Sequence, residues 1–270
     1  MKTAIAALAK EEDPYIDEWL DYHFRLGFDE IHLLQHGGWE YAGRGFPGLV
    51  RHSVPQATRQ SNALNAWLDE WRNAVDWALF SDIDEFVCLK NGDNDIKAFL
   101  ERYDGFNGLC LNWRYFGNAG LSEDGDYRVV ARFTRCARRL DPTVKQLVHC
   151  ARAGADAHLV DVHTLIVGRD TRKTIQVYPA IANASGRHCQ EKLGFQIDDL
   201  PECLETAYLA HYKCKTLGEY RKRLERNRRY FNICNTPADF AFVLGQYYDY
   251  NRNEDEELAL LRFQQTGSFL

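Results

Sequence analysis

The stretch from residue 4 to residue 34, AIAALAKEEDPYIDEWLDYHFRLGFDEIHLL, decides the fold class. It opens with an apolar run over Ala4–Ala9 and closes with another over Ile31–Leu34. Between these runs, four residues have the i, i+3, i+4, i+7 spacing of one helix face: Ile16, Trp19, Leu20 and His23. A strand, a helix and a second strand in this order predict the βαβ unit of a parallel sheet.

The boundaries of this first helix have their own signals. Asp13 is typical of a helix N-cap, and Pro14 suits the first helical position. Gly27 is placed to end the helix. The pattern then recurs, with a second apolar helix stripe formed by Leu64, Trp67, Leu68 and Trp71. A fully apolar strand over 77–80 follows, which suits a sheet covered on both faces. A third helix stripe is formed by Ile96, Phe99, Leu100 and Tyr103.

The second half of the chain has a different hydrophobic pattern. From about residue 127 to 182 the apolar segments are short and partly alternate, as in antiparallel strands. We expect another strand in 204–213, a helix from about 216 with a very basic outer face, and a helical tail over 231–270. Together these patterns predict one α/β domain. Its central sheet is expected to be mainly parallel with helices on both faces, and its C-terminal half mixed or antiparallel.

Composition narrows the function classes. Among 270 residues, 45% are hydrophobic, so a sizeable core can form. The net charge of −6 is unlike that of a general nucleic-acid binder. No apolar run reaches the ~18 residues of a membrane span. The N-terminal apolar stretch is too brief for a signal peptide. The eight cysteines include no C-x-x-C pair, which favours reduced thiols and a cytoplasmic location.

Three carboxylates follow the apolar strand in DWALFSDIDEF, residues 76–86. Ligands of open α/β sheets bind outside the carboxyl ends of the strands, where Asp82 and Asp84 are expected to lie. Hard oxygen ligands suit Mg²⁺ or Mn²⁺, and such an ion can neutralise a leaving diphosphate. The alternative is a plain acidic cluster that caps the next turn in solvent. The position directly after a buried strand favours the metal site.

Four blocks in order resemble the family 2-like glycosyltransferases, in the branch with a compact GT-A fold and a D-x-D-E-F block. The blocks are AKEEDPYIDEWLDYHFRLGFDEIHLL (9–34), DWALFSDIDEFV (76–87), LNWRYFGNAG (111–120) and LAHYKCKTLGEYRKR (209–223). The resemblance implies a GT-A-like, Rossmann-like domain over 1–230, with a nucleotide-sugar half at about 1–105 and an acceptor half at about 106–230. Residues 231–270 would be a C-terminal helical extension.

The resemblance also implies an activity. The enzyme would move a hexose from a nucleotide sugar, with a UDP-sugar expected, to a glycan or lipid-linked acceptor by an inverting, metal-dependent reaction. Surface polysaccharide or glycoconjugate synthesis is the expected context. Asp82 and Asp84 would hold Mn²⁺ or Mg²⁺. His211 would be the third metal ligand, with His163 as the rival.

Other residues are assigned singly by the resemblance. Glu11 would bind the base or ribose, Arg59 and Gln60 the nucleotide, and Trp113 a sugar face. Two of these residues have a purely structural alternative: Arg59 as an ordinary surface residue at a helix start, and Trp113 as a core residue. Residues 35–39, QHGGW, depart from the polar turn of the family, which leaves the nucleotide open.

The basic segment 211–230 allows three interpretations. It is a solvated helix face, a diphosphate contact through Lys213 or Lys215, or a peripheral docking surface for an anionic membrane through arginines such as Arg221, Arg223 and Arg228. Nucleic acid is not expected as a partner, because no aromatic interleaving accompanies the charge.

The catalytic base is the least specified assignment. Asp124 is our candidate, and three other acids remain open: Glu123, Asp126 and Asp161. Two other function classes also remain open. The same acids suit a nucleotidyltransferase or phosphohydrolase, and a non-catalytic sugar-binding module would need no Asp pair with a late His.

Overall fold

A computed structural model describes residues 1–90, 92–125, 127–167, 169–170, 175–176, 181–187, 201–231 and 236–269. The central sheet contains β1 (Thr3–Ala9), β2 (Glu30–His36), β3 (Leu49–Val54), β4 (Trp77–Phe80), β5 (Glu85–Leu89), β6 (Gly108–Tyr115), β8 (Val144–His149), β13 (Ile181–Asn183) and β14 (Ala207–His211). The shorter strands are β7 (Arg135–Cys136), β9 (Ala157–Leu159), β10 (Leu165–Val167), β11 (Arg169–Asp170), β12 (Ile175–Gln176) and β15 (Asp255–Glu256). These short strands pair with one another as β9–β10, β11–β12 and β7–β15.

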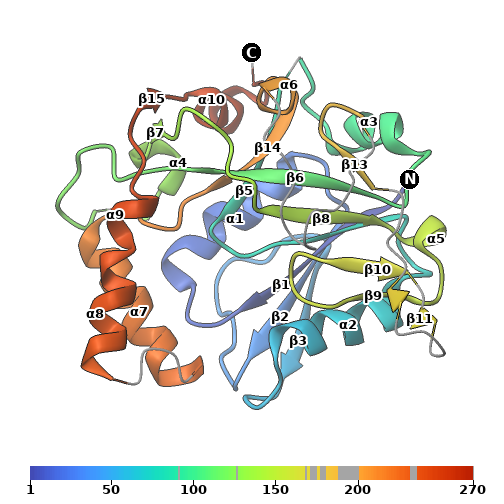
Figure 1. Cartoon of the computed structure of the whole chain (residues 1–270), viewed down its shortest axis with the longest axis horizontal. Helices are drawn as coiled ribbons and strands as arrows, with labels where there is room; N and C mark the ends of the chain where they lie inside the picture. The colour runs from blue at the N-terminus through green and yellow to red at the C-terminus, as the bar shows by residue number, and fades with distance from the viewer. Residues whose placement is uncertain are drawn as a thin grey trace.

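The helices surround this sheet (Figure 1). They are α1 (Asp13–Arg25), α2 (Gln60–Trp71), α3 (Ile96–Leu100) continued by the 3₁₀ turn η1 (Glu101–Tyr103), α4 (Val129–Arg132), α5 (Cys150–Ala153), α6 (Pro201–Leu204), α7 (Leu217–Phe231), α8 (Pro237–Gly245), α9 (Tyr247–Tyr250) and α10 (Ala259–Thr266). In the described part of the chain, no helix is both long and apolar enough to span a membrane.

The sheet is parallel at one end and mixed at the other. Its order is β3-β2-β1-β4-β8-β6-β14-β5, with β13 beside β6. Neighbours among β3, β2, β1 and β4 are all parallel, whereas β8 runs antiparallel to both β4 and β6. The prediction of one α/β domain with a mixed C-terminal half is therefore confirmed, and the sheet is compatible with a Rossmann-like fold. The domain boundaries given above stay a prediction.

Helices cover both faces of the sheet because strand residues alternate between faces. On β1, Ile5 and Ala7 pack in the cluster that contains Trp19 of α1. Ala4 and Ala6 pack in a second cluster with α2 residues. The core positions predicted from the sequence, Trp19, Leu64, Trp67 and Phe80, are 0 to 3% exposed. Local periodicity therefore identified the buried faces correctly.

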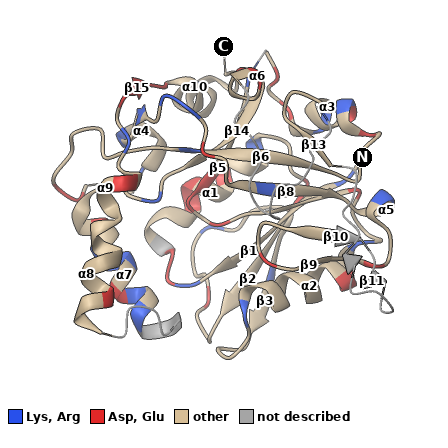
Figure 2. Cartoon of the chain, in the orientation of Figure 1, with Lys and Arg blue, Asp and Glu red and all other residues tan. Residues whose placement is uncertain are grey.

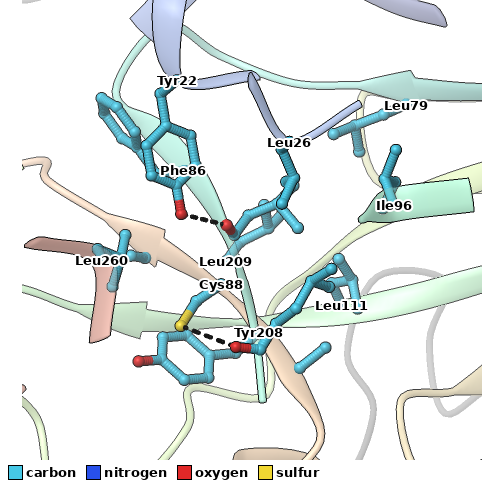
Figure 3. Packing of buried hydrophobic residues seen from close by; sticks show 14 of the residues in the cluster. Tyr22, Leu26, Leu79, Phe86, Cys88, Ile96, Leu111, Tyr208, Leu209 and Leu260 are labelled. Atoms are coloured by element: carbon cyan, nitrogen blue, oxygen red, sulfur yellow. Dashed lines mark hydrogen bonds between the residues drawn. The ribbon is translucent and has the colours of Figure 1, made fainter. Parts of the chain in front are cut away.

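Strands β5 and β3 of the sheet were not predicted from the sequence. Strand β5 directly follows the carboxylates and runs antiparallel to β14 at the end of the sheet. Its residues Phe86 and Val87 are buried beside α1. Figure 3 shows Tyr22 of α1 packing on Phe86, and the Tyr22 hydroxyl donates to the Val87 carbonyl at 2.7 Å. The other missed strand, β3, pairs with β2.

Helix boundaries differ little from expectation. Helix α1 includes Asp13, and Glu12 stands at the N-cap without a side-chain cap, so the predicted capping role of Asp13 is wrong. The N–H of Gly27 bonds to Phe24, and its φ of +102° lies in the region that favours glycine. The tail is mainly helical as predicted, but its acidic part forms β15, paired with β7.

The C-terminal segment packs on the same core as α1. Leu260 and Phe263 of α10 are buried in that cluster, and Tyr22 meets the Phe263 ring at 5.1 Å between centroids. Helices α7 and α8 form a separate small cluster, and Figure 1 shows them side by side.

The cysteines in the described residues are buried; they are Cys88, Cys110, Cys136, Cys150, Cys203 and Cys214. Their reduced state stays a prediction. Cys189 and Cys234 lie outside the described residues.

The buried side chain of His23 should make the stability of the fold sensitive to acid. It is fully buried, its Nδ1–H donates to the Trp19 carbonyl at 2.9 Å, and burial lowers its pKa to about 3. Below the ordinary pKa of about 6.5, the unfolded chain binds this proton and the folded chain does not, so stability falls as pH falls. We expect His23→Gln to lose less stability between pH 7 and pH 4 than wild type, by about 1.4 kcal/mol per pH unit below 6.5. Urea unfolding at several pH values measures this, and parallel pH curves would contradict it.

Candidate functional site

A pocket of about 450 Å³ opens at the carboxyl ends of β1 and β4, and we call it the strand-end pocket. The loop after β14 and helix α7 close its other side. Its polar lining consists of Lys10, Glu11, Glu12, Gln60, Asp82, Asp84, Asp124, Lys213, Lys215, Glu219, Lys222, Arg223, Arg226 and Asn227. Because parallel strands end at one edge of a sheet, residues far apart in the sequence meet here.

The Asp84 carboxylate contacts both a guanidinium and an imidazole in the strand-end pocket. Its Oδ2 lies 3.0 Å from Arg223 Nη1 and 3.6 Å from His211 Nε2. Burial alone would raise the pKa of Asp84, but the charge of Arg223 and the contact with His211 hold it well below its usual range. The carboxylate is therefore ionised at neutral pH, which is the form that binds a cation.

His211, at the end of β14, lies beside Asp84 as the sequence analysis proposed for a metal ligand. Burial lowers its pKa to about 4, so the ring is neutral at pH 7. Neither ring nitrogen has a hydrogen-bond partner among the described residues, although both are buried. A neutral imidazole with a vacant nitrogen beside a carboxylate is chemically suited to bind a divalent cation.

Asp82 is held by two partners. Its Oδ1 accepts from Gln60 Nε2 at 2.8 Å, and its Oδ2 lies 2.7 Å from the ammonium of Lys145. Burial would raise the pKa of Asp82, but Lys145 lowers it below the ordinary value. Gln60 therefore reaches the strand-end pocket as expected, through Asp82, and Lys145 is a partner that the sequence analysis did not identify.

The metal assignment stays a prediction. In the described residues, no group of three or more His, Cys, Asp and Glu side chains forms a metal cage. A cation would therefore bind through Asp84 and His211, with further oxygens from a substrate. This fits Mg²⁺, which is commonly held by one or two carboxylates and substrate phosphates.

Two lysines on the loop after β14 line the strand-end pocket. Neither Lys213 nor Lys215 has a carboxylate partner among the residues that the structure describes. Lys213 Nζ lies 3.7 Å from the Tyr250 ring centre, and burial lowers its pKa to about 8. Lys215 Nζ donates to the Tyr212 carbonyl at 2.9 Å. An anion is the natural partner for both.

The basic helix is not only a solvated face. Figure 2 shows Lys and Arg positions of α7 interspersed with acidic ones. Arg223 reaches Asp84, and Arg226 Nη1 lies 2.7 Å from Glu12. The proposal that Arg223 faces a membrane is therefore wrong, because this side chain points into the strand-end pocket. Arg221 and Arg228 remain exposed.

Two residues of the strand-end pocket have an unfavourable backbone conformation. Three described non-glycine residues have positive φ, and two of them line it: Glu11 at +51° and Lys215 at +55°. Such conformations are unfavourable for residues with a Cβ and persist where the surrounding structure enforces them, commonly at functional sites. Glu11 lines the strand-end pocket directly after β1, as expected for a ligand-binding position.

Two other predicted residues lie beside the strand-end pocket without lining it. Arg59 is exposed at the N-terminus of α2. Trp113 is 8% exposed, and its ring centroid is 4.3 Å from that of His211. The rival ligand His163 donates to the Val144 carbonyl at 2.7 Å and contacts the Trp113 ring.

The base candidate Asp124 lines the strand-end pocket. Its hydrogen bonds with Lys222 and Thr216 lower its pKa, which weakens it as a base. Of the other candidates, Glu123 is exposed, Asp161 binds the backbone N–H of His163, and Asp126 lies outside the described residues. The base assignment stays a prediction.

Lys145 and the inward arginines, Arg223 and Arg226, were not predicted from the sequence. The position of Lys145 close to the apolar pair Leu147 and Val148 was the available signal, because a lysine in a buried strand needs a partner. For α7, the i, i+3 spacing of Arg223 and Arg226 places both on one face.

Comparison with known proteins identifies no family. No family model and no curated protein matches the chain. Similar solved structures include HddC from Yersinia pseudotuberculosis, at 9% identity and a TM-score of 0.35, covering 67% of this chain and 90% of that one. A second structure of HddC, complexed with GMP-PN, matches at 9% identity and a TM-score of 0.36, with the same coverage.

These findings correct the family assignment made from the four sequence blocks. The resemblance to family 2-like glycosyltransferases and the hexosyltransferase activity that it implies are withdrawn, because no family model matches the chain. Short blocks of this kind follow the βαβ pattern and the strand-end acids, which unrelated α/β enzymes share.

Proposed function

We propose that this protein binds the phosphate chain of a nucleotide in the strand-end pocket and acts on it as a nucleotidyltransferase or phosphohydrolase. The observation that carries the proposal is the pair Lys213 and Lys215. Both line the pocket that contains Asp82 and Asp84, and neither has a carboxylate partner in the described part of the chain. Cations without carboxylate partners, next to ionised carboxylates, suit a ligand that brings both phosphates and a divalent cation.

The acidic and the basic side chains of the strand-end pocket have complementary roles in this proposal. Asp84 and His211 would hold Mg²⁺ or Mn²⁺ together with phosphate oxygens. When bound, the ion supplies Lewis-acid neutralisation of the phosphates. Arg223 already neutralises Asp84 at 3.0 Å and is placed to contact the same phosphates.

The reaction that this arrangement favours is substitution at phosphorus. In nucleotidyl transfer, an oxygen of the second substrate bonds to the α-phosphorus while the bond to the bridging oxygen of pyrophosphate breaks. In hydrolysis, water is that nucleophile. Negative charge grows on the leaving phosphates, where Lys213 and Lys215 would stabilise it. The pyrrolidine of Pro14 and the ring of Tyr15 add apolar surface to the pocket for the rest of the nucleotide.

The lysines give the first test. We expect Lys213→Met with Lys215→Met to weaken binding of a Mn²⁺–nucleoside triphosphate by about 10-fold or more, since each charged hydrogen bond contributes ~1.5–3 kcal/mol. Methionine keeps the apolar stem and removes the charge. Calorimetry with the four common ribonucleoside triphosphates measures this, and release of pyrophosphate or orthophosphate separates the two reactions.

The matched control is Lys2→Met, at the opposite end of β1, where Lys2 pairs with Glu30 at 2.9 Å. It should leave nucleotide affinity unchanged. Equal nucleotide affinity in the double variant, the control and the wild type would overturn the proposal.

A further inference from the structure

Lys145 is a buried ammonium between the carboxyl groups of Asp82 and Glu85, under the strand-end pocket. It extends from β8 and its side chain is 1% exposed. Its Nζ lies 2.7 Å from Asp82 Oδ2 and 3.5 Å from Glu85 Oε1. A lysine is almost never buried this fully unless it is paired, so these contacts explain why it is tolerated.

Glu85 has one satisfied oxygen and one vacant oxygen. Its Oε2 accepts from the Asp82 N–H at 2.9 Å and from the Ser81 hydroxyl at 3.0 Å. Its Oε1 is buried and has no hydrogen-bond partner among the described residues. Leaving a buried carboxylate oxygen without a hydrogen bond is unfavourable. Glu85 Oε1 is therefore a second acceptor for the Lys145 ammonium, which needs only a short movement from Asp82 Oδ2 to reach it.

Each oxygen of Asp82 already has one partner. Oδ2 accepts from Lys145 and Oδ1 accepts from Gln60. The side chain is nevertheless one-third exposed and lines the strand-end pocket, so a cation held by Asp84 and His211 would approach it. Asp82 could serve as a further ligand of that cation only if the Lys145 ammonium moved, because the two positive charges repel each other.

We infer that Lys145 is a positioning residue that occupies Asp82 until a divalent cation arrives with the phosphates of the substrate, and then moves to Glu85 Oε1. This inference rests on the proposed function for the identity of the substrate. The exchange needs no bond breaking: Asp82 passes from the ammonium to the incoming cation, and the ammonium passes to the vacant oxygen. A metal ion that binds alone adds a positive charge next to Lys145. When the ion binds together with a nucleotide, the negative charge of the phosphates offsets that added positive charge. Metal and nucleotide therefore bind cooperatively.

Two substitutions have opposite expected effects. Lys145→Met removes the competing cation, so affinity for Mn²⁺ alone should rise by about 10-fold or more, since a like charge has been removed from the site. Glu85→Gln makes the second place a weaker acceptor for the ammonium, which then stays on Asp82. Affinity for Mn²⁺ alone should therefore fall by about 10-fold. Structural damage would lower affinity in both variants, so the opposite signs separate positioning from folding.

The measurement is titration of free Mn²⁺ by electron paramagnetic resonance, with and without a nucleoside diphosphate. Lys90→Met is the matched control, because Lys90 also forms an internal ion pair, 2.8 Å from Glu257, away from the strand-end pocket. It should bind Mn²⁺ as wild type does. Thermal unfolding confirms that each variant is folded, and Lys145→Gln, which also removes the charge, replaces Lys145→Met if the latter does not fold.

Each outcome decides the inference. Lower Mn²⁺ affinity in the lysine variant, or unchanged affinity in Glu85→Gln, would show that Lys145 is a fixed partner of Asp82. Wild type that binds no Mn²⁺, with or without nucleotide, would also overturn it. If the Mn²⁺ responses are as expected but no nucleotide binds, the exchange stands and the proposed function fails.

Discussion

Asp84→Asn is expected to lower the affinity for a Mn²⁺–nucleotide complex by about 100-fold or more, which is the largest effect at the site. Asparagine keeps the size of the side chain and removes the charge that faces Arg223 at 3.0 Å and His211 at 3.6 Å. The affinity falls because the cation loses a charged ligand, and charge-assisted contacts are the strong ones. The Arg223 guanidinium also loses its carboxylate partner, which lowers the stability of the fold rather than the affinity.

Calorimetric titration with nucleotide, in the presence of Mn²⁺ and in the presence of a chelator, measures this effect. The matched control is Asp69→Asn on the outer face of α2, where the carboxylate is 73% exposed. Asp84→Asn should bind nucleotide equally with and without Mn²⁺, because the metal-dependent part of the affinity is lost. A metal-dependent increase in affinity that survives in Asp84→Asn would place the cation elsewhere.

Trp19→Ala is expected to have the largest effect on the fold. Trp19 is fully buried in α1, and its indole N–H donates to the Glu85 carbonyl at 2.7 Å. Removing a buried tryptophan commonly costs about 3–5 kcal/mol, which is a large part of the stability of a domain. The same change leaves a buried carbonyl unpaired at the start of β5, one residue after Asp84. Nucleotide binding should therefore weaken as well as stability.

Urea unfolding of Trp19→Ala, Trp19→Phe and wild type separates the two contributions. Phenylalanine retains much of the packing and loses the hydrogen bond, so we expect it to lie between the other two, about 1–3 kcal/mol below wild type. Trp39→Ala is the control, because Trp39 is only partly buried. A loss of stability in Trp39→Ala as large as in Trp19→Ala would contradict the expectation.

Much of the N-terminal half could be predicted from the sequence because its signals are local. The helical spacing of Trp19 and its neighbours and the apolar run of β4 identified buried faces correctly. The position of Asp82 and Asp84 after a buried strand was enough to locate the strand-end pocket. The strands β3 and β5 were not predicted, because they lack a distinct periodic pattern and pair with β2 and β14, which lie elsewhere in the sequence. Propensity in such strands depends on neighbours rather than on the segment itself.

The ionic contacts of the pocket were decided by the tertiary structure alone. Lys145 meets Asp82 across 63 residues of sequence because β8 inserts beside β4, and Arg226 meets Glu12 because α7 packs with its Arg223 face toward the strand ends. Sequence by itself determined which segments are buried and where the acids lie, because hydrophobic periodicity is read within a few residues. Which cation neutralises each acid depends on distance and burial in space, and only the arrangement of the strands and α7 brings those charges within a few ångströms.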